Sequence, residues 1–391
     1  EFFRGVASYF KKHQWQNTEL RDLLVELERE SGRDLSHWSK LWLETAGVNT
    51  LKPEIEETEG KISSFKVIQT TQEGHDYQRP HRMGIGFFSL ESGKLKRTHH
   101  LELDVDGPAT EVAELHGMTR PDLVLLNDAD LAYAKVRLDE PSRLVAMENL
   151  SGIEDSLART LVWTAAWDAT RDGEAPARDF IKLVLRHIAS ETESTTVTTL
   201  LRQLITTGNL YVHPGAREQT LTEIADGLIS LTESAKPGSD NQLQFAKFVP
   251  QFARTNSQLN WLGGLLDGTK EISGLKVDQD LRWELLTGLV IGGAAGEKEI
   301  AKELASDNTA GGQKFAAACR AAIPSAEAKA EAWRVLTETE DYSNTLVNSA
   351  SLAFGRVNDL SLLEPYAKSY MDVALRIWNE RSYHIASYLL T

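Results

Sequence analysis

The sequence is short of sulfur, of basic charge and of long apolar runs. Cys319 is its only cysteine, so no disulfide can form within the chain. This thiol ends an alanine-rich helical run, residues 315–319, which favours a buried small apolar side chain over a reactive one. A chain without disulfides fits a reducing compartment, and we expect a cytoplasmic protein.

Basic residues are outnumbered, with 42 Lys and Arg against 57 Asp and Glu and a formal net charge of −15. Proteins bind nucleic acid by neutralising phosphates, and no basic stripe with interleaved aromatics is present, so we expect no nucleic-acid partner. The most apolar stretch, residues 285–296, is interrupted by three glycines and falls short of the roughly 18 residues that a membrane helix needs. We therefore expect no membrane partner.

The first fifty residues have helical periodicity. One stripe repeats at the spacing of an amphipathic helix, with apolar residues at Leu20, Leu23, Leu24 and Leu27. Asp34 or Ser36 can cap the next helix, which we expect to bury Trp38, Leu41 and Trp42. Two such helices cannot form a core alone. Because the chain also starts without a Met or a helix cap, we expect it to begin inside a domain whose remainder covers these apolar faces.

Residues 53–60 are acidic and suggest a linker, and the period then changes from helical to two. Strands are predicted at residues 61–70, 84–90, 96–105, 111–115, 123–127 and 131–138, with a tight hairpin turn at Ser92-Gly93. Within residues 96–105, Leu101, Leu103 and Val105 alternate with His100, Glu102 and Asp104. Six or seven short strands at this spacing are typical of a small β-sandwich.

From about Arg143 the pattern is helical to the end. Later helices are predicted at residues 242–254, 258–266, 280–290, 297–304, 313–322, 327–337, 344–354, 360–380 and 383–390. Short helices joined by short breaks stack into a superhelix like that of HEAT or armadillo pairs, although no exact repeat is present. The predicted fold class is a multidomain, mainly α, α+β chain: a helical remnant, a small β-sandwich and an α-solenoid.

Several segments resemble one family. Near the N-terminus they are residues 9–10, Asn17, 22–23, 31–35, Trp38, 42–43 and 45–51; further on they are 125–127, 132–136, Asp139, 155–159, Trp163, 328–329, Trp333, 364–366, Trp378 and 381–382. Together these segments resemble the aminopeptidase N family of zinc gluzincin exopeptidases, in its actinobacterial-like form, over essentially the whole chain. The first fifty residues are similar to the last helices of the family's catalytic domain.

The resemblance implies three parts: residues 1–52 as the end of a thermolysin-like catalytic domain, 53–142 as a β-sandwich, and 143–391 as a helical C-terminal domain. The intact parent would remove N-terminal residues from peptides with a zinc ion held in the missing N-terminal half. The part present would enclose the active-site chamber, restrict peptide access and be inactive alone. The alternative is an independent α-solenoid scaffold that binds a protein or peptide.

The sequence offers no metal site that stands on its own. A zinc exopeptidase needs His-Glu-x-x-His on a helix, and this motif does not occur. His100, Glu102 and Asp104, with His99 adjacent, have a spacing that ligands could use, but a solvated polar face explains them more simply. His187 and Glu191 lie one helical turn apart, which is typical of a surface pair.

Three other motifs are incomplete. Residues 145–149 share four residues with the family's Gly-Ala-Met-Glu-Asn amine-binding motif, yet no zinc helix follows, so we interpret the match as coincidence. The pair Gly84 and Gly86 lacks the third glycine of a dinucleotide loop, and residues 292–298 lack the Gly-Lys-Ser/Thr end of a phosphate loop. We assign no catalytic, cofactor-binding or metal-binding residue.

Overall fold

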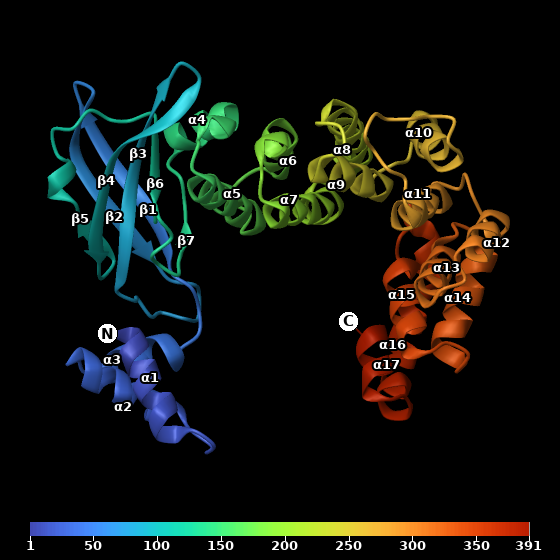
Figure 1. Cartoon of the computed structure of the whole chain (residues 1–391), viewed down its shortest axis with the longest axis horizontal. Helices are drawn as coiled ribbons and strands as arrows, with labels where there is room; N and C mark the ends of the chain where they lie inside the picture. The colour runs from blue at the N-terminus through green and yellow to red at the C-terminus, as the bar shows by residue number, and fades with distance from the viewer. Residues whose placement is uncertain (391) are drawn as a thin grey trace. The chain divides into compact units, whose positions relative to one another are not determined.

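The computed structural model describes residues 1–390, which are mainly helical with two small sheets (Figure 1). The chain divides into two compact units, Glu1–Asp172 and Gly173–Thr391. The first unit contains both sheets and the helices on either side of them in the sequence, and the second unit is helical.

Unit 1 begins with three helices, continues through the strands and ends with two further helices. The helices are α1 (Phe2–His13), α2 (Leu20–Ser31), α3 (Ser36–Leu43), α4 (Glu140–Asn149) and α5 (Ser156–Arg171), with 3₁₀ turns η1 (Ala113–Leu115) and η2 (Leu150–Gly152). The strands are β1 (Thr50–Thr58), β2 (Lys61–Thr70), β3 (His81–Glu91), β4 (Lys94–Val105), β5 (Ala109–Glu111), β6 (Leu123–Leu126) and β7 (Lys135–Val136).

The two sheets have the strand orders β5-β2-β1-β7 and β4-β3-β6. All named pairs are antiparallel except β1 with β7, which are parallel. Residues from both sheets meet in one apolar core, which contains Phe65 and Val67 of β2, Ile85 and Phe87 of β3, and Val124 of β6. Burial of these faces is the main force that holds unit 1 together.

The predicted linker at residues 53–60 is wrong, because most of it is strand β1. Leu51 and Pro53 are buried, Ile55 is half-buried, and the acidic Glu54 and Glu56 point to solvent. This is the period-two pattern of a strand with one covered face. Its register with β2 runs from Thr50 opposite Thr70 to Thr58 opposite Lys61, so the two strands form a hairpin whose first strand the four glutamates concealed.

Two other strand predictions need adjustment. Residues 111–115 are not a strand: β5 ends at Glu111 and η1 follows it. Of residues 131–138 only Lys135–Val136 pair as a strand. The hairpin prediction is confirmed, because Glu91 pairs with Lys94 and the two residues between them, Ser92 and Gly93, have φ of 51° and 80°.

A buried arginine ties α3 to the sheets. Arg79 lies just before β3, and its guanidinium donates to the carbonyl oxygens of Leu41 at 3.0 Å and Gly47 at 2.9 Å and to the Thr45 hydroxyl at 2.7 Å. The same group lies 5.4 Å from the centre of the Trp42 ring. Arg79 thus satisfies backbone carbonyls that α3 leaves free at its C-terminal end.

His81 lies in the same junction. Its ring meets the Trp42 ring edge-on at 5.3 Å between centroids, and Nε2 lies 3.4 Å from the Asn49 side-chain oxygen. Burial and, to a smaller extent, the nearby positive charge of Arg79 together lower the pKa of His81 to about 4. His81 is therefore neutral in the folded protein at neutral pH.

Unit 2 is a succession of helices. They are α6 (Ala177–His187), α7 (Ser194–Thr206), α8 (Pro214–Ser234), α9 (Asp240–Phe248), α10 (Asn256–Asp267), α11 (Gln279–Ile291), α12 (Glu297–Ser306), α13 (Ala310–Ala322), α14 (Ala326–Glu338), α15 (Asn344–Phe354), α16 (Glu364–Glu380) and α17 (Tyr383–Leu389). Short 3₁₀ or π turns extend some of them: η3 (Ile188–Ser190), η4 (Thr207–Tyr211), η5 (Val249–Gln251) and η6 (Leu360–Leu363). The predicted helix at 344–354 has the observed bounds of α15.

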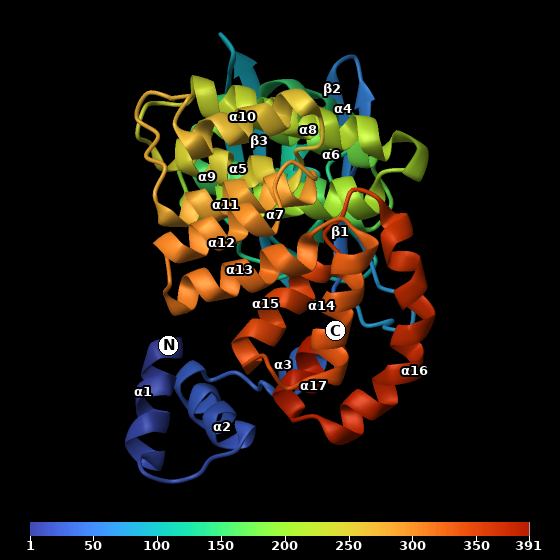
Figure 2. The same ribbon diagram turned by 90° about the vertical axis from the view of Figure 1, so that its right-hand side faces the viewer.

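The helices of unit 2 pack in a regular order. Helix α7 contacts α9, and the contacts continue from α9 to α11, α13, α15 and α17, so alternate helices form one continuous row. Figure 2 shows α11 and α13 running side by side. The core under the second half of this row contains Trp283, Leu286, Ala316 and Val347.

A buried lysine joins α14 to two helices of this row. Lys329 of α14 is fully buried, and its Nζ donates to the carbonyl oxygens of Ala321 on α13 at 2.6 Å and Phe354 on α15 at 2.7 Å. Burial lowers the pKa of Lys329 to about 8. A neutral amine still has two N–H groups, so both carbonyls remain satisfied when the proton leaves.

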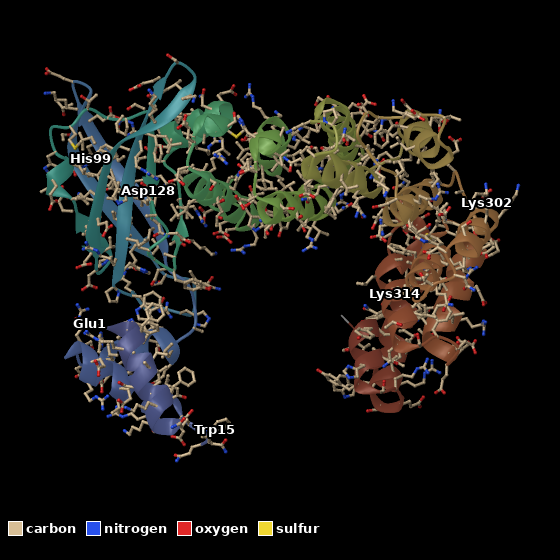
Figure 3. The ribbon with its side chains drawn as sticks, in the orientation of Figure 1. Glu1, Trp15, His99, Asp128, Lys302 and Lys314 are labelled. Carbon is tan, nitrogen blue, oxygen red and sulfur yellow. The ribbon has the colours of Figure 1, made fainter. Side chains whose placement is uncertain are left out.

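Replacing Lys329 with Met should destabilise unit 2, because the apolar stem is kept while two buried carbonyls lose their donors. We expect a loss of about 2–5 kcal/mol, from about 1–3 kcal/mol for each orphaned group. Urea unfolding followed by circular dichroism measures it. The control is Lys314→Met on the exposed face of α13 (labelled in Figure 3), which should change stability by less than about 0.5 kcal/mol. Equal midpoints for the two variants would contradict the capping role.

The stability of unit 1 should fall as the pH drops from about 6.5 to 4. The unfolded His81 takes up a proton near its ordinary pKa of about 6.5, whereas the folded one resists until about 4, so protons favour the unfolded state across this window. We expect a contribution on the order of 2 kcal/mol, read from urea midpoints by Trp fluorescence. His81→Phe should flatten this part of the pH profile, and His37→Phe, at an exposed position of α3, should leave it unchanged.

Candidate functional site

The polar face of β4 is held by ion pairs. His100, Glu102 and Asp104 point to the same side as predicted, and Arg82 of β3 lies between the two carboxylates, 3.3 Å from each. His99 does not join them and packs with its ring centre 5.8 Å from that of Phe87. Arg82 therefore occupies the position where a shared cation would have to lie.

Behind this face lies a buried carboxylate that the sequence did not reveal. Asp128 has no exposed surface, and its oxygens accept from Arg97 at 2.8 Å and lie 2.9 Å from His100 Nδ1. Arg97 also donates to Asp155 at 2.7 Å, the residue that caps the N-terminus of α5. The cluster links β4, the turn after β6 and α5, and every charge in it has a partner. Figure 3 labels Asp128 and His99.

The glycine pair of β3 makes room for that carboxylate. A Cβ on Gly84 would lie 2.2 Å from the Asp128 backbone oxygen, and one on Gly86 would lie 2.4 Å from a side-chain oxygen of Asp128. Both distances are shorter than atoms tolerate. The pair is needed for the close approach of the Asp128 turn to β3, as expected for glycines within a strand.

The other sequence motifs have structural roles. Residues 145–149 lie on helix α4, with Glu148 exposed, whereas the amine-binding motif they resemble lies on a strand. In residues 292–298, Gly292 ends α11, and Gly296 begins α12, where its N–H donates to Glu299 at 3.0 Å.

The interpretation of His187 and Glu191 as a surface pair is wrong. His187 is 3% exposed and Glu191 is 2% exposed, and α6 ends at His187, so the two do not share a helix. The 3₁₀ turn η3 separates them. The polar character of the two side chains suggested a surface, but both are buried in the folded chain.

Cys319 is buried, as predicted. It has no exposed surface, lies within the apolar core of unit 2, and its sulfur is 3.2 Å from the Thr287 hydroxyl. Burial raises the pKa of the thiol to about 11, because a thiolate loses its hydration there. The thiolate that would react is thus scarce at neutral pH.

Within residues 1–390, no set of three or more His, Cys, Asp or Glu residues is placed to hold a metal ion. Among the helices of the described residues, none has both the length and the apolar character that crossing a membrane requires.

The surface that stands out in unit 1 is apolar. In residues 1–48 only Leu24 is a buried hydrophobic residue, whereas Phe3 is 83% exposed and Trp15 is 99% exposed. Figure 3 shows Trp15 projecting from the turn after α1. We call the following set the exposed apolar residues of α1–α3: Phe2, Phe3, Phe10, Trp15, Leu20, Val25, Trp38 and Leu43.

Trp38 corrects one prediction. It was expected to be buried with Leu41 and Trp42, but it is 43% exposed, and the other two are half-buried. Helices α1 and α2 contact each other through Gly5 and Leu27, where a Cβ on Gly5 would lie 2.7 Å from a Leu27 methyl, and through Glu26, which pairs with Lys12 at 3.0 Å. This interface is too small to cover their aromatic side chains.

Comparison with known proteins identifies the class. The model of the ERAP1-like C-terminal domain matches residues 123–391. Aminopeptidase N of Streptomyces lividans is 44% identical over 393 aligned residues, which are 98% of this chain and 46% of that protein. Aminopeptidase N of Lactococcus lactis is 41% identical over 54 residues, 14% of this chain and 6% of that protein.

A solved structure shows the same fold. The structure of Legionella pneumophila aminopeptidase A in complex with aspartic acid superposes with a TM-score of 0.63 at 14% identity, and the match covers 98% of this chain and 49% of that one. The chain thus has the fold of an aminopeptidase's C-terminal half, and it belongs to the family of ERAP1-like C-terminal domains. It spans less than half the length of the curated relatives it matches.

Native Cys319 should not react with a thiol reagent at neutral to mildly alkaline pH, because it is buried and its pKa is raised to about 11. Dithionitrobenzoate absorbance measures this. The thiol should react fully once urea unfolds the protein, and a Ser306→Cys variant, at an exposed position of α12, should react at once in the native state. Rapid reaction of the unmodified native chain would disprove the assignment.

Proposed function

We propose that this chain is the C-terminal, non-catalytic portion of a zinc metallo-aminopeptidase. The observation that carries the proposal is the 44% identity to the Streptomyces lividans aminopeptidase N over 98% of this chain. Residues 1–52 would be the last helices of the catalytic domain, 53–142 a β-sandwich and 143–391 a helical solenoid. The two sheets with a shared core and the continuous row of alternate helices support this division. A match of this extent to one enzyme gives no support to an independent scaffold.

The role we propose for the solenoid is to enclose the parent's active site and to limit access to peptides that fit inside. We also propose a cytoplasmic location. The single cysteine is free and buried and cannot form a disulfide within the chain, which fits a reducing compartment.

The zinc ion of such an enzyme does not fit this chain, because the described residues offer no set of ligands for it. We therefore place the ion in the preceding half of the parent and derive no catalytic step from the residues present. His100, which lies on the acidic face of β4, is engaged with Asp128 at 2.9 Å.

The exposed apolar residues of α1–α3 would be covered by that preceding half. About half of the Streptomyces relative lies outside the matched region, so enough chain exists to cover them. Aromatic side chains that remain this exposed usually mark an interface. Arg79 holds α3 to the sheets. The same contact would therefore fix the position of the catalytic domain relative to the two sheets.

The chain alone should show no aminopeptidase activity and bind no stoichiometric zinc. Aminoacyl chromogenic substrates test the first point and metal analysis of the dialysed protein tests the second. Turnover that a chelator abolishes, or one zinc ion per chain, would refute the proposed division of labour.

Supplying the N-terminal half of the Streptomyces lividans relative as a separate polypeptide should restore chelator-sensitive turnover. Phe3→Asp should weaken the association of the two halves by at least about tenfold, since a charge would be buried against apolar surface. Leu90→Asp, an exposed apolar residue at the end of β3, is the matched control and should associate normally. Equal association of both variants, measured by light scattering, would remove α1–α3 from the interface.

A further inference from the structure

Unit 2 contains a cavity that its own side chains leave open. It lies among α12, α13, α14 and α15 and has a volume of about 230 Å³. Its walls are mostly small and apolar, with Ala317 and Ala321 from α13, Ala328 and Ala332 from α14, and Ala350 from α15. Ile323, Val335 and Leu336 complete the apolar wall.

This cavity reaches the surface, because Glu297 and Glu331 in its lining are 57% and 61% exposed. Its volume limits which molecules it can hold. An apolar cavity of about 150 Å³ is known to take up benzene, so one of about 230 Å³ has room for a bicyclic aromatic molecule. The alanines leave the space open because each lacks the side-chain carbons that a leucine would place in it.

Tyr342 supplies one polar group to the wall. Its hydroxyl forms no hydrogen bond with any residue between 1 and 390, although the ring is partly buried against the core of unit 2. Tyr342 also lines a second, more polar cavity of about 300 Å³, together with Arg381 and Ser382. Tyr342 is the one uncharged polar residue among those that line the first cavity, so it is the residue there to which a neutral molecule would donate a hydrogen bond.

The charges at the cavity are already paired. Arg320 donates from two nitrogens to the Glu297 carboxylate, at 2.7 and 2.9 Å, and Arg334 holds Glu331 at 2.7 Å. A ligand with a net charge would find no free counter-ion here. The chemistry points to a neutral molecule with one N–H or O–H group.

We propose that this cavity, among α12, α13, α14 and α15, is a binding site for a small neutral aromatic molecule that donates one hydrogen bond to the Tyr342 hydroxyl. The site is independent of the peptidase function, because it lies within unit 2 and needs no residue of a preceding half.

Indole is the probe, and indene, which has the same shape without the N–H, is its partner. The full chain is labelled with ¹³C at the alanine methyl groups, and each compound is titrated to millimolar concentration. Indole should shift the methyl signals of the five cavity alanines in a saturable manner. Indene should bind about threefold to tenfold more weakly, the value of one neutral hydrogen bond.

Two variants locate the binding. Ala332→Leu fills the cavity and should weaken indole by at least about tenfold, whereas Ala330→Leu, an exposed position on the same helix, should bind like the unmodified chain. Tyr342→Phe should remove the difference between indole and indene without a loss of helix content. The absence of saturable shifts with the unmodified chain, shifts confined to other alanines, or equal binding by the two leucine variants would overturn the proposal.

Discussion

Helix ends impose the constraint on which this structure depends most. The last carbonyls of a helix have no partner inside it and need donors from elsewhere. Here basic side chains from other elements supply them: Arg79 at α3, Arg282 at Leu266 of α10, Arg381 at Thr339 after α14, and Lys329 at both α13 and α15. In a chain with far more acids than bases, several of the bases are thus committed to joining elements that lie apart in the sequence.

Small residues have two opposite uses in this fold. Gly84 and Gly86 let the Asp128 turn pack directly on β3, where a single methyl group would collide with it. The alanines of α13, α14 and α15 leave space that nothing in the described chain fills. The first use closes the structure around a paired carboxylate, and the second leaves a cavity open.

The charged side chains and the exposed apolar side chains of unit 1 differ in whether they have partners. Arg82 pairs with both carboxylates on the polar face of β4, and Arg97 pairs with Asp128 and Asp155, so these charges are neutralised locally. In contrast, most aromatic side chains of α1–α3 have no covering partner. Leu24 is the one buried hydrophobic residue among residues 1–48. This difference supports the proposal that α1–α3 pack against a further domain.

The sequence alone determined what depends on neighbouring residues. Periodicity predicted β2 and α15 with their observed bounds, the Ser92-Gly93 turn followed from its short-range signature, and the resemblance to the aminopeptidase N family came from local segments such as residues 45–51. The candidate metal residues on β4 were correctly placed on one face, but their partner Arg82 could not be predicted, because it belongs to another strand.

Tertiary structure decided which side chains of these local patterns are buried. Residues 53–60 looked like a linker until β2 and β7 supplied partners for β1, and His187 and Glu191 looked exposed until neighbouring helices buried them. Trp38 had the opposite outcome, because α1 and α2 offer too little surface to bury it. The physical reason is the same in each case. A repeat of two or 3.6 residues fixes which side chains share a face, whereas burial depends on residues that only the folded chain brings near.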